Sequence, residues 1–287
     1  SMWDPLVRVA VRPPSRTGDY HGAHWAAPID FGMLERQHRD FCTLLRTLGC
    51  DVIELDAQPH MPDSIFTYDP CFVFESGFVA FQAAKPSRES EAETLAAEMS
   101  DLGIPLVGRL TGTAVADGGD LFWLDGRTLA IGRSYRTNDD AIQQIRDLVG
   151  PAVTVETFDV PHDQGPEFCL HLLSVVSPIR DDLAVVYPRL APVRLLQALA
   201  DRGITCVEVP EDDYLTLGCN VLAIEPGVVV IASGNDATVA RLRDHGVDVH
   251  VYQASEISKG EGGPTCLTRP ILRAKNAMIG SWATIRS

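Results

Sequence analysis

Six side chains capable of chemistry recur along this 287-residue chain in groups about 50 residues apart. In chain order they are Asp69, Asp117, Asp120, His171, Asn220 and Cys266. Together they supply carboxylates, an imidazole, an amide and a thiol. In thiol-nucleophile enzymes a thiolate attacks the substrate, a histidine transfers protons, and an acid orients the histidine. If the fold brings these groups together, they predict a cysteine-dependent enzyme.

Each residue alone has a plainer interpretation. A single histidine before a strand, such as His171, is more often structural. A lone cysteine at the start of a strand, such as Cys266, is more often a core thiol. The DGGD sequence at 117–120 could be a turn or part of an oxygen-ligand metal site. Recurrence at equivalent places in the chain favours the catalytic interpretation.

Five segments have the apolar spacing of helices, and a glycine follows each of them, as is common where helices end. The predicted helices cover residues 31–48, 89–102, 138–149, 192–202 and 236–245. A short β-rich run comes after each glycine. These runs cover residues 50–55, 104–110, 152–158, 204–209 and 247–252.

A hairpin pattern precedes four of the helices, with turn residues between two apolar runs. The hairpins cover residues 71–82, 121–132, 172–187 and 221–232. The fifth is split, because 265–272 near one end of the chain and 6–12 near the other could pair and close a ring. Five strand–strand–helix–strand (ββαβ) units predict an α/β fold of one domain over 3–287, a propeller-like ring with pseudo-five-fold symmetry. The loop entering each hairpin would then face the central axis.

Composition excludes several classes of function. The formal net charge of −15 argues against nucleic-acid and anionic-membrane partners and suits a cationic substrate, although acidity could serve solubility alone. No apolar run is long enough for a membrane helix, and no signal pattern begins the chain. Seven scattered cysteines without CxxC pairs indicate neither a disulfide framework nor a zinc site. We therefore expect a cytoplasmic protein, and we interpret Ser1 as an expression remnant.

Taken together, the motifs resemble those of the guanidino-group modifying (pentein) superfamily, a five-bladed α/β-propeller fold. Within it the chain is most similar to dimethylarginine dimethylaminohydrolases. The resemblance spans about residue 36 to residue 266. It rests on 62-PDSIFTYD-69, 86-PSR-88, 117-DGGD-120, 132-GRSYRTN-138, 171-HLLS-174 and 265-TC-266.

The resemblance implies a role for each site residue. Cys266 would be the nucleophile, His171 the general acid and base, and Asp117 the acid that orients His171 or the substrate. The remaining residues would bind the substrate. Asp69 and Asp63 would pair with its guanidinium and Arg88 and Arg136 would hold its α-carboxylate, with Glu261, Asp120, Tyr68 and Asn220 also in the site. The substrate would be a small cationic arginine derivative. Neither a metal nor an organic cofactor is implied, and a homodimer is left open.

Two positions depart from that family. Tyr68 stands where a glutamate is expected, and Leu173 where a lysine is common. Tyr68 predicts a site with one fewer anion and an aromatic surface, which would accept alkylated guanidines. Arginine deiminases carry a second acid two residues after the histidine, which is the position of Leu173. Arginine deiminase, arginine dihydrolase and amidinotransferase activities remain alternatives, as does a non-catalytic binding propeller.

Segment 14–28 is rich in turn residues and has no apolar period. It is either a lid over the site or an ordinary surface connection. His21 and His24 could suggest a metal, but no partner ligands lie nearby in the sequence.

Overall fold

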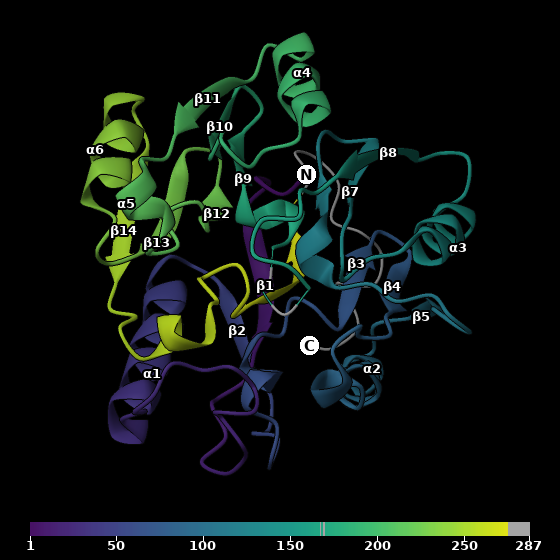
Figure 1. The fold of residues 1–287 in the computed structure, drawn as a ribbon, viewed down its shortest axis with the longest axis vertical. Coiled ribbons are helices and arrows are strands. Elements are labelled where there is room, and N and C mark those ends of the chain that lie inside the picture. Colours follow the sequence, from purple (N-terminus) through teal and green to yellow (C-terminus); the bar gives the residue numbers. More distant parts are fainter. Residues whose placement is uncertain (167, 169, 275–287) are drawn as a thin grey trace.

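The computed structural model describes residues 1–166, 168 and 170–274, which form an α/β fold of five three-stranded sheets. In every sheet the middle strand pairs antiparallel with one neighbour and parallel with the other. Figure 1 shows the sheets around the middle of the molecule and the long helices on its periphery. The repeated ββαβ unit predicted from the sequence is confirmed.

Five helices connect the middle strand of each sheet to its parallel partner, because a parallel connection needs a crossover. They are α1 (Phe31–Thr47), α2 (Glu91–Asp101), α3 (Asp139–Val149), α4 (Val193–Asp201) and α6 (Asp236–Asp244). These bounds lie within two residues of the predicted ones. The glycine after each helix has a positive φ, which favours glycine at a helix end.

Four of the sheets are built from consecutive strands. They contain β3 (Cys71–Phe74), β4 (Gly77–Ala80) and β5 (Leu106–Arg109); β6 (Leu121–Trp123), β7 (Thr128–Arg133) and β8 (Thr154–Asp159); β9 (Val176–Arg180), β10 (Leu183–Val186) and β11 (Thr205–Glu208); and β12 (Leu222–Glu225), β13 (Val228–Ala232) and β14 (Asp248–Tyr252).

The fifth sheet joins the two ends of the described chain, as the split hairpin predicted. Strand β15 (Arg269–Arg273) pairs antiparallel with β1 (Leu6–Val11), which pairs parallel with β2 (Asp51–Glu54). Val9 in β1 is opposite Pro270 on one side and Val52 on the other. The last strand therefore depends on the first for its position.

The structure also differs from the sequence prediction at the points that carry the site. Residues 172–174 form a 3₁₀ turn, η4 (Leu172–Ser174), and 118–120 form another, η3 (Gly118–Asp120), where a hairpin or loop was expected. Residues 263–268 make two turns before β15 begins, through bonds from Leu267 N to Gly263 O and from Thr268 N to Thr265 O. These turns lift side chains out of the strands. Three further 3₁₀ turns, η1 (Pro62–Ile65), η2 (Pro86–Arg88) and η5 (Ile257–Gly260), and a short helix, α5 (Glu211–Tyr214), were not predicted.

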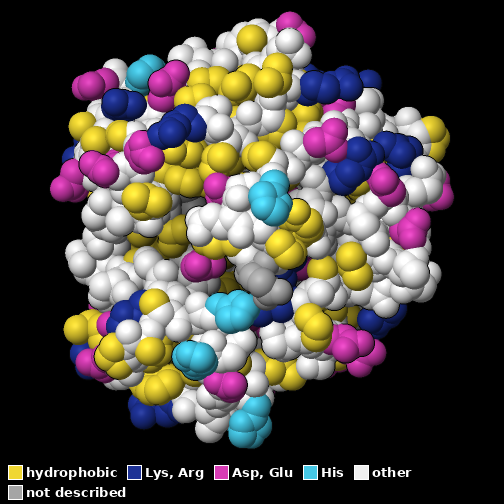
Figure 2. Space-filling model, in the orientation of Figure 1, with side chains coloured by type: hydrophobic (Ala, Val, Ile, Leu, Met, Phe, Trp, Pro, Cys, Tyr) yellow, Lys and Arg dark blue, Asp and Glu magenta, His cyan; other side chains and the backbone are white. Residues whose placement is uncertain are grey.

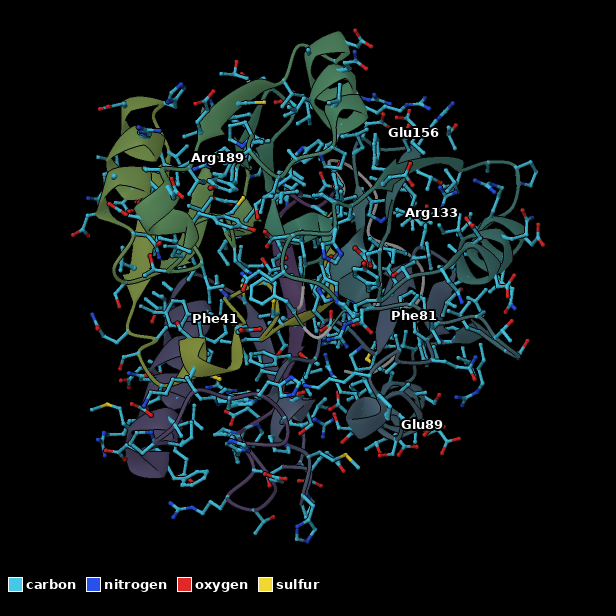
Figure 3. All side chains as sticks on the ribbon, viewed as in Figure 1. Phe41, Phe81, Glu89, Arg133, Glu156 and Arg189 are labelled. Carbon is cyan, nitrogen blue, oxygen red and sulfur yellow. The ribbon has the colours of Figure 1, made fainter. Side chains whose placement is uncertain are left out.

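Apolar side chains from the sheets and from the inner faces of the helices form the core. Phe41 of α1 is fully buried, and Phe81 beyond β4 is nearly so. Figure 3 labels both side chains, one on either side of the middle of the molecule. Among the described residues, no helix is both long enough and apolar enough to cross a membrane.

Candidate active site

A pocket of about 520 Å³ gathers most of the predicted site residues. Figure 2 shows histidine, acidic and hydrophobic side chains near the middle of one face. Of the predicted set, the pocket is lined by Asp63, Tyr68, Asp69, Arg88, Asp117, Arg136, His171, Asn220, Glu261 and Cys266. Asp120 does not line it. The fold thus brings together groups that are far apart in the sequence.

Cys266 lies in the turn just before β15 and is half-buried. Its carbonyl accepts a bond from Tyr68 N (3.2 Å), and its Sγ accepts one from Asn220 Nδ2 (3.1 Å). Burial raises the pKa of the Cys266 thiol to about 11, and the nearby Asp69 carboxylate adds to the rise; the Gly263 N–H and the Asn220 amide oppose it. The thiol is therefore largely protonated at neutral pH in the free protein, with two donors ready to stabilise its thiolate.

Asn220 holds the cysteine turn from both sides. Its Oδ1 accepts a bond from Thr265 N (3.0 Å), while its amide nitrogen faces the sulfur. A Cβ on Gly263 would come within 2.6 Å of the Asn220 side chain. The glycine in GGPTC thus lets the turn approach the asparagine. Asn220, predicted as a substrate contact, lies against Cys266.

His171 and Asp117 form the second functional pair. His171 Nε2 lies 3.1 Å from Asp117 Oδ2, and both side chains are buried. The His171 backbone is fixed by bonds between His171 N and Ser174 Oγ and between Ser174 N and His171 O, each of 3.0 Å. An imidazole held by a buried carboxylate is the arrangement that proton transfer requires.

The DGGD motif is explained by close packing around this pair. A Cβ on Gly118 would lie 2.2 Å from Tyr68 O, and one on Gly119 would lie 2.3 Å from His171 Nδ1. Only glycine fits at either position. Asp120 Oδ1 accepts a bond from Leu172 N (2.9 Å), the residue after His171, and its other oxygen accepts bonds from Ser134 and Thr137. Asp120 thus fixes the start of η4 from outside the pocket.

Asp69 and Arg88 form a buried ion pair at the pocket wall. Arg88 Nη1 donates to Asp69 Oδ2 (2.6 Å), and the other Asp69 oxygen accepts a bond from Gly119 N (3.0 Å). Burial alone would raise the pKa of Asp69, but the Arg88 guanidinium outweighs it and the pKa is lowered. Arg88 also donates to Glu91 Oε2 (2.8 Å) and to Phe66 O (3.1 Å). Its guanidinium is largely occupied by the protein itself.

Arg136, unlike Arg88, has a guanidinium that protein carboxylates in the described chain do not occupy. It is 8% exposed and lines the pocket, yet within the described chain its guanidinium has no carboxylate partner and its buried Nε has no hydrogen-bond partner. Glu261, also at the pocket, has a left-handed backbone with φ of 62°. Desolvation raises the pKa of Glu261, while Lys85, His24 and Arg136 oppose that rise. Arg136 is thus a cation available to a ligand anion.

Asp63 connects the pocket to segment 14–28. Its carboxylate accepts bonds from Trp25 Nε1 (2.8 Å) and from Lys85 Nζ (2.6 Å). Trp25 is buried, stacks on Phe66 with ring centroids 5.6 Å apart, and packs so closely on Gly260 that a Cβ there would touch its ring. The segment therefore lies over one side of the pocket, where His24 lines it.

Tyr68 lines the pocket but directs its phenol into the protein. Its hydroxyl donates to Leu121 O (3.3 Å), and the Arg269 guanidinium lies 4.1 Å above its ring. The side chain is 2% exposed. The part of Tyr68 closest to the nucleophile is its backbone, which bonds to Cys266.

Several pocket residues were not singled out from the sequence as site residues. Lys85 directly precedes the PSR motif, so its position was a signal that could have been used. Phe66 lies within the PDSIFTYD motif but was not itself singled out. The others belong to no quoted motif: Ala23, Phe168, Tyr214, Leu215, Thr216 and Ser258. Their contribution depends on how neighbouring units pack, which no local pattern encodes.

Solved structures with the same fold act on guanidino compounds or contain their products. DDAH from Pseudomonas aeruginosa, a cysteine-to-serine mutant in complex with citrulline, superposes with a TM-score of 0.77 at 19% identity, covering 92% of this chain and 98% of that one. The N-terminal domain of ArgZ, an arginine dihydrolase of cyanobacteria, superposes with a TM-score of 0.80 at 16% identity. The match covers 93% of this chain and 98% of that one. At these identities the likeness shows the fold alone.

Relatives found by sequence have higher identities to this chain than those solved structures. Arginine deiminase from Limosilactobacillus fermentum is 29% identical over 74% of this chain, which spans 62% of that protein's length. Arginine deiminase from Lactococcus lactis subsp. lactis is 26% identical over 93% of this chain and 77% of its own. The Bacillus subtilis protein YkgA is 29% identical over 83% of this chain and 80% of its own length.

The fold is shared with those solved structures, and its pocket brings Cys266, His171 and Asp117 together. The arginine deiminase family model matches residues 57–196 and 190–273, well over half of the chain. The chain belongs to the arginine deiminase family.

Proposed function

We propose that this protein hydrolyses a guanidinium C–N bond of a small arginine derivative, with methylated arginine as the substrate and citrulline as the product. The observation that supports it best is the convergence of two held pairs in one pocket. These are Asn220 with Cys266 and Asp117 with His171, each at 3.1 Å. A non-catalytic binding propeller would not need a thiol and an imidazole prepared in this way.

In the proposed reaction the Cys266 thiolate attacks the guanidinium carbon. Binding of a cationic substrate beside the thiol would lower its pKa and supply the thiolate that the free protein lacks. The C–N bond to the departing amine breaks as His171 gives that amine a proton, leaving a covalent thiouronium on sulfur. His171 then takes a proton from water, the hydroxide adds to the same carbon, and the C–S bond breaks to release the product.

Carboxylates would position the cationic group. Asp69 and Asp117 are the buried acids nearest the catalytic residues, and opposite charges at short range localise and orient a guanidinium. Arg88 keeps Asp69 ionised, and we assign it that positioning role in preference to a direct grip on substrate. Arg136 would hold the substrate's α-carboxylate.

The arginine assignments are tested by a matched pair of variants. We expect Arg136→Gln to raise KM for amino-acid substrates at least tenfold, with little effect on agmatine, which lacks the carboxylate. Arg88→Gln should lower kcat for both substrates and lower the stability, because it leaves two acids buried without their cation. Equal effects of Arg136→Gln on arginine and agmatine would contradict the carboxylate grip.

Apolar residues beside His171 support the choice of a methylated substrate. Leu173 lines the pocket where arginine deiminases carry a second acid, and Phe168 lines it nearby. An apolar wall at that place would accept methyl groups on the guanidinium. One or two methyl groups are worth only about 1–3 kcal/mol in such a pocket. Arginine deiminase activity is therefore the second candidate, and the family match favours it.

A product assay separates the candidates. The enzyme is given asymmetric dimethylarginine, monomethylarginine and arginine in parallel, and dimethylamine, methylamine and ammonia are quantified together with citrulline. We expect the highest kcat/KM with a methylated substrate. Ammonia released from arginine at a higher kcat/KM would instead establish a deiminase, and ornithine as the product would indicate a dihydrolase. Turnover that requires an acceptor amine would indicate an amidinotransferase. If none of the three substrates is turned over, the result would favour a non-catalytic binding propeller.

The remaining expectations concern the whole protein. We propose that the five ββαβ units close into a five-bladed propeller forming one domain over residues 3–287, and that segment 14–28 serves as a lid. The scattered thiols support a cytoplasmic location, because that compartment keeps cysteines reduced. Measuring the molecular mass of the protein in solution would test whether it forms a homodimer.

A further inference from the structure

A second cavity, of about 650 Å³, lies on the other side of the active-pocket wall. Tyr68 and Thr265 line both cavities, so one thin partition separates them. Arg269 and Arg273, the first and last residues of β15, line the second cavity. None of the proposed chemistry uses them.

Arg269 is a buried cation whose partners among the described residues are neutral. It is 3% exposed, and its Nη1 donates to two carbonyl oxygens, those of Tyr68 (2.9 Å) and Cys71 (2.6 Å). Its guanidinium lies over the rings of Tyr68 and Phe72. Its buried Nε has no hydrogen-bond partner among the described residues.

Arg273 repeats this arrangement at the other end of the strand. Its Nη1 donates to Asp4 O (2.7 Å) and Ala223 O (2.9 Å), and within the described chain its buried Nη2 has no partner. Burial lowers the pKa of Arg273 to about 10. Of the two acids lining the cavity, Asp4 pairs with the N-terminal amine (2.5 Å). Among the ion pairs of Asp4 in the described part of the chain none involves Arg269 or Arg273, and the hydrogen bonds of these two arginines there go to backbone oxygens.

Other buried arginines of this protein show how unusual that is. Arg12 pairs with Glu98 (2.6 Å), and Arg88 pairs with Asp69 and Glu91. A buried charge is costly unless an opposite charge or several hydrogen bonds compensate for it. Arg136, which has no acidic partner in the described part of the chain either, is the residue proposed to hold the substrate's carboxylate. Arg269 and Arg273 likewise have no acidic partner in the described part of the chain, and they line the second cavity.

The rest of that cavity is mainly apolar. Its walls include Phe74, Val107, Trp123, Leu148 and Val153. Arg269 and Arg273 each have a buried N–H group without an acceptor in the described part of the chain, which suits a carboxylate oxygen, and the apolar walls suit a hydrocarbon body. We propose that this cavity is a second binding site, separate from the active site, for a small organic carboxylate with an apolar body.

The test uses octanoate as the probe, with binding to the full chain measured by isothermal titration calorimetry. Because Arg136 in the active pocket could also hold a carboxylate, the decisive comparison is between two Arg→Gln variants, one in each cavity. We expect Arg273→Gln to weaken octanoate binding at least tenfold and Arg136→Gln to leave it within about twofold. Octan-1-ol, which has the same body without the charge, should bind at least tenfold more weakly than octanoate.

A further variant keeps the test decisive if Arg273→Gln fails to fold. Val153 is half-buried on the cavity wall, and Val153→Glu would place a carboxylate opposite the probe. We expect this variant to abolish octanoate binding while circular dichroism shows an intact fold. Octanoate binding that is lost in Arg136→Gln and kept in Arg273→Gln or Val153→Glu would overturn the proposal, as would no binding to the parent protein. None of these readouts depends on the substrate assigned to the active site.

Discussion

The Cys266 thiol is surrounded by opposing electrostatic influences, and these can be separated by alkylation with neutral iodoacetamide. Since the pKa is raised to about 11, we expect the inactivation rate to rise close to tenfold per pH unit from pH 7 to 10. Asp69→Asn removes a nearby negative charge, so it should lower the pKa and accelerate inactivation at pH 7. Asn220→Ala removes a donor to sulfur and should slow it. A rate independent of pH across this range would contradict the protonated thiol.

Replacing the sulfur itself tests its role as nucleophile. We expect Cys266→Ser to reduce turnover to well below a tenth, because a serine hydroxyl is far less ionised than a thiol and Asp117–His171 would not compensate. Substrate binding and circular dichroism should stay unchanged. A serine variant with more than about a tenth of the parent activity would rule out a thiolate mechanism.

The imidazole should act on chemistry more than on binding. We expect His171→Ala to lower kcat by about 10²–10⁴, the usual contribution of general acid–base catalysis, with a smaller change in KM. Hydrolysis of the thiouronium would slow with it, so mass spectrometry should detect an adduct on Cys266. Unchanged kcat would show that another group transfers the protons.

At the scale of elements, short turns place the side chains of the proposed catalytic site. Turn η3 brings Gly119 so close to His171 that an added Cβ would lie 2.3 Å from Nδ1. We therefore expect Gly119→Ala to displace the imidazole from Asp117 and lower kcat at least tenfold. Gly126→Ala, in the hairpin turn of the same unit where a Cβ meets nothing within 4 Å, should leave kcat within twofold. Equal activity of the two variants would show that η3 tolerates the extra atom.

At the scale of the whole molecule, the pairing of β1 with β15 supports the turn that contains Cys266. Val9 is fully buried in β1, the middle strand of the sheet that contains β15. We expect Val9→Ala to lower the free energy of unfolding by about 2 kcal/mol, since it removes buried methyl groups and leaves a cavity. Val7→Ala, two residues away and 39% exposed, should change it by less than about 0.5 kcal/mol. Urea denaturation followed by circular dichroism measures both.

Repetition in the sequence determined the ββαβ unit, the five helices and the split hairpin. Apolar period and helix-ending glycines are local signals, and five copies of them agree. The same repetition predicted which residues meet, because equivalent positions in a ring face a common axis. Cys266, His171, Asp117, Asp69 and Asn220 do line one pocket.

Tertiary structure alone decided what each of these side chains touches. Asn220 bonds to the sulfur of Cys266, and Asp120 lies outside the pocket and holds the turn after His171. Arg88 is occupied by Asp69 and Glu91, whereas Arg136 has no carboxylate partner among the described residues. These partners come from different units at sequence separations that no local pattern spans. Hydrogen-bond geometry is set within tenths of an ångström by the packing of those units, so the residue types could be identified from the sequence while their partners could not.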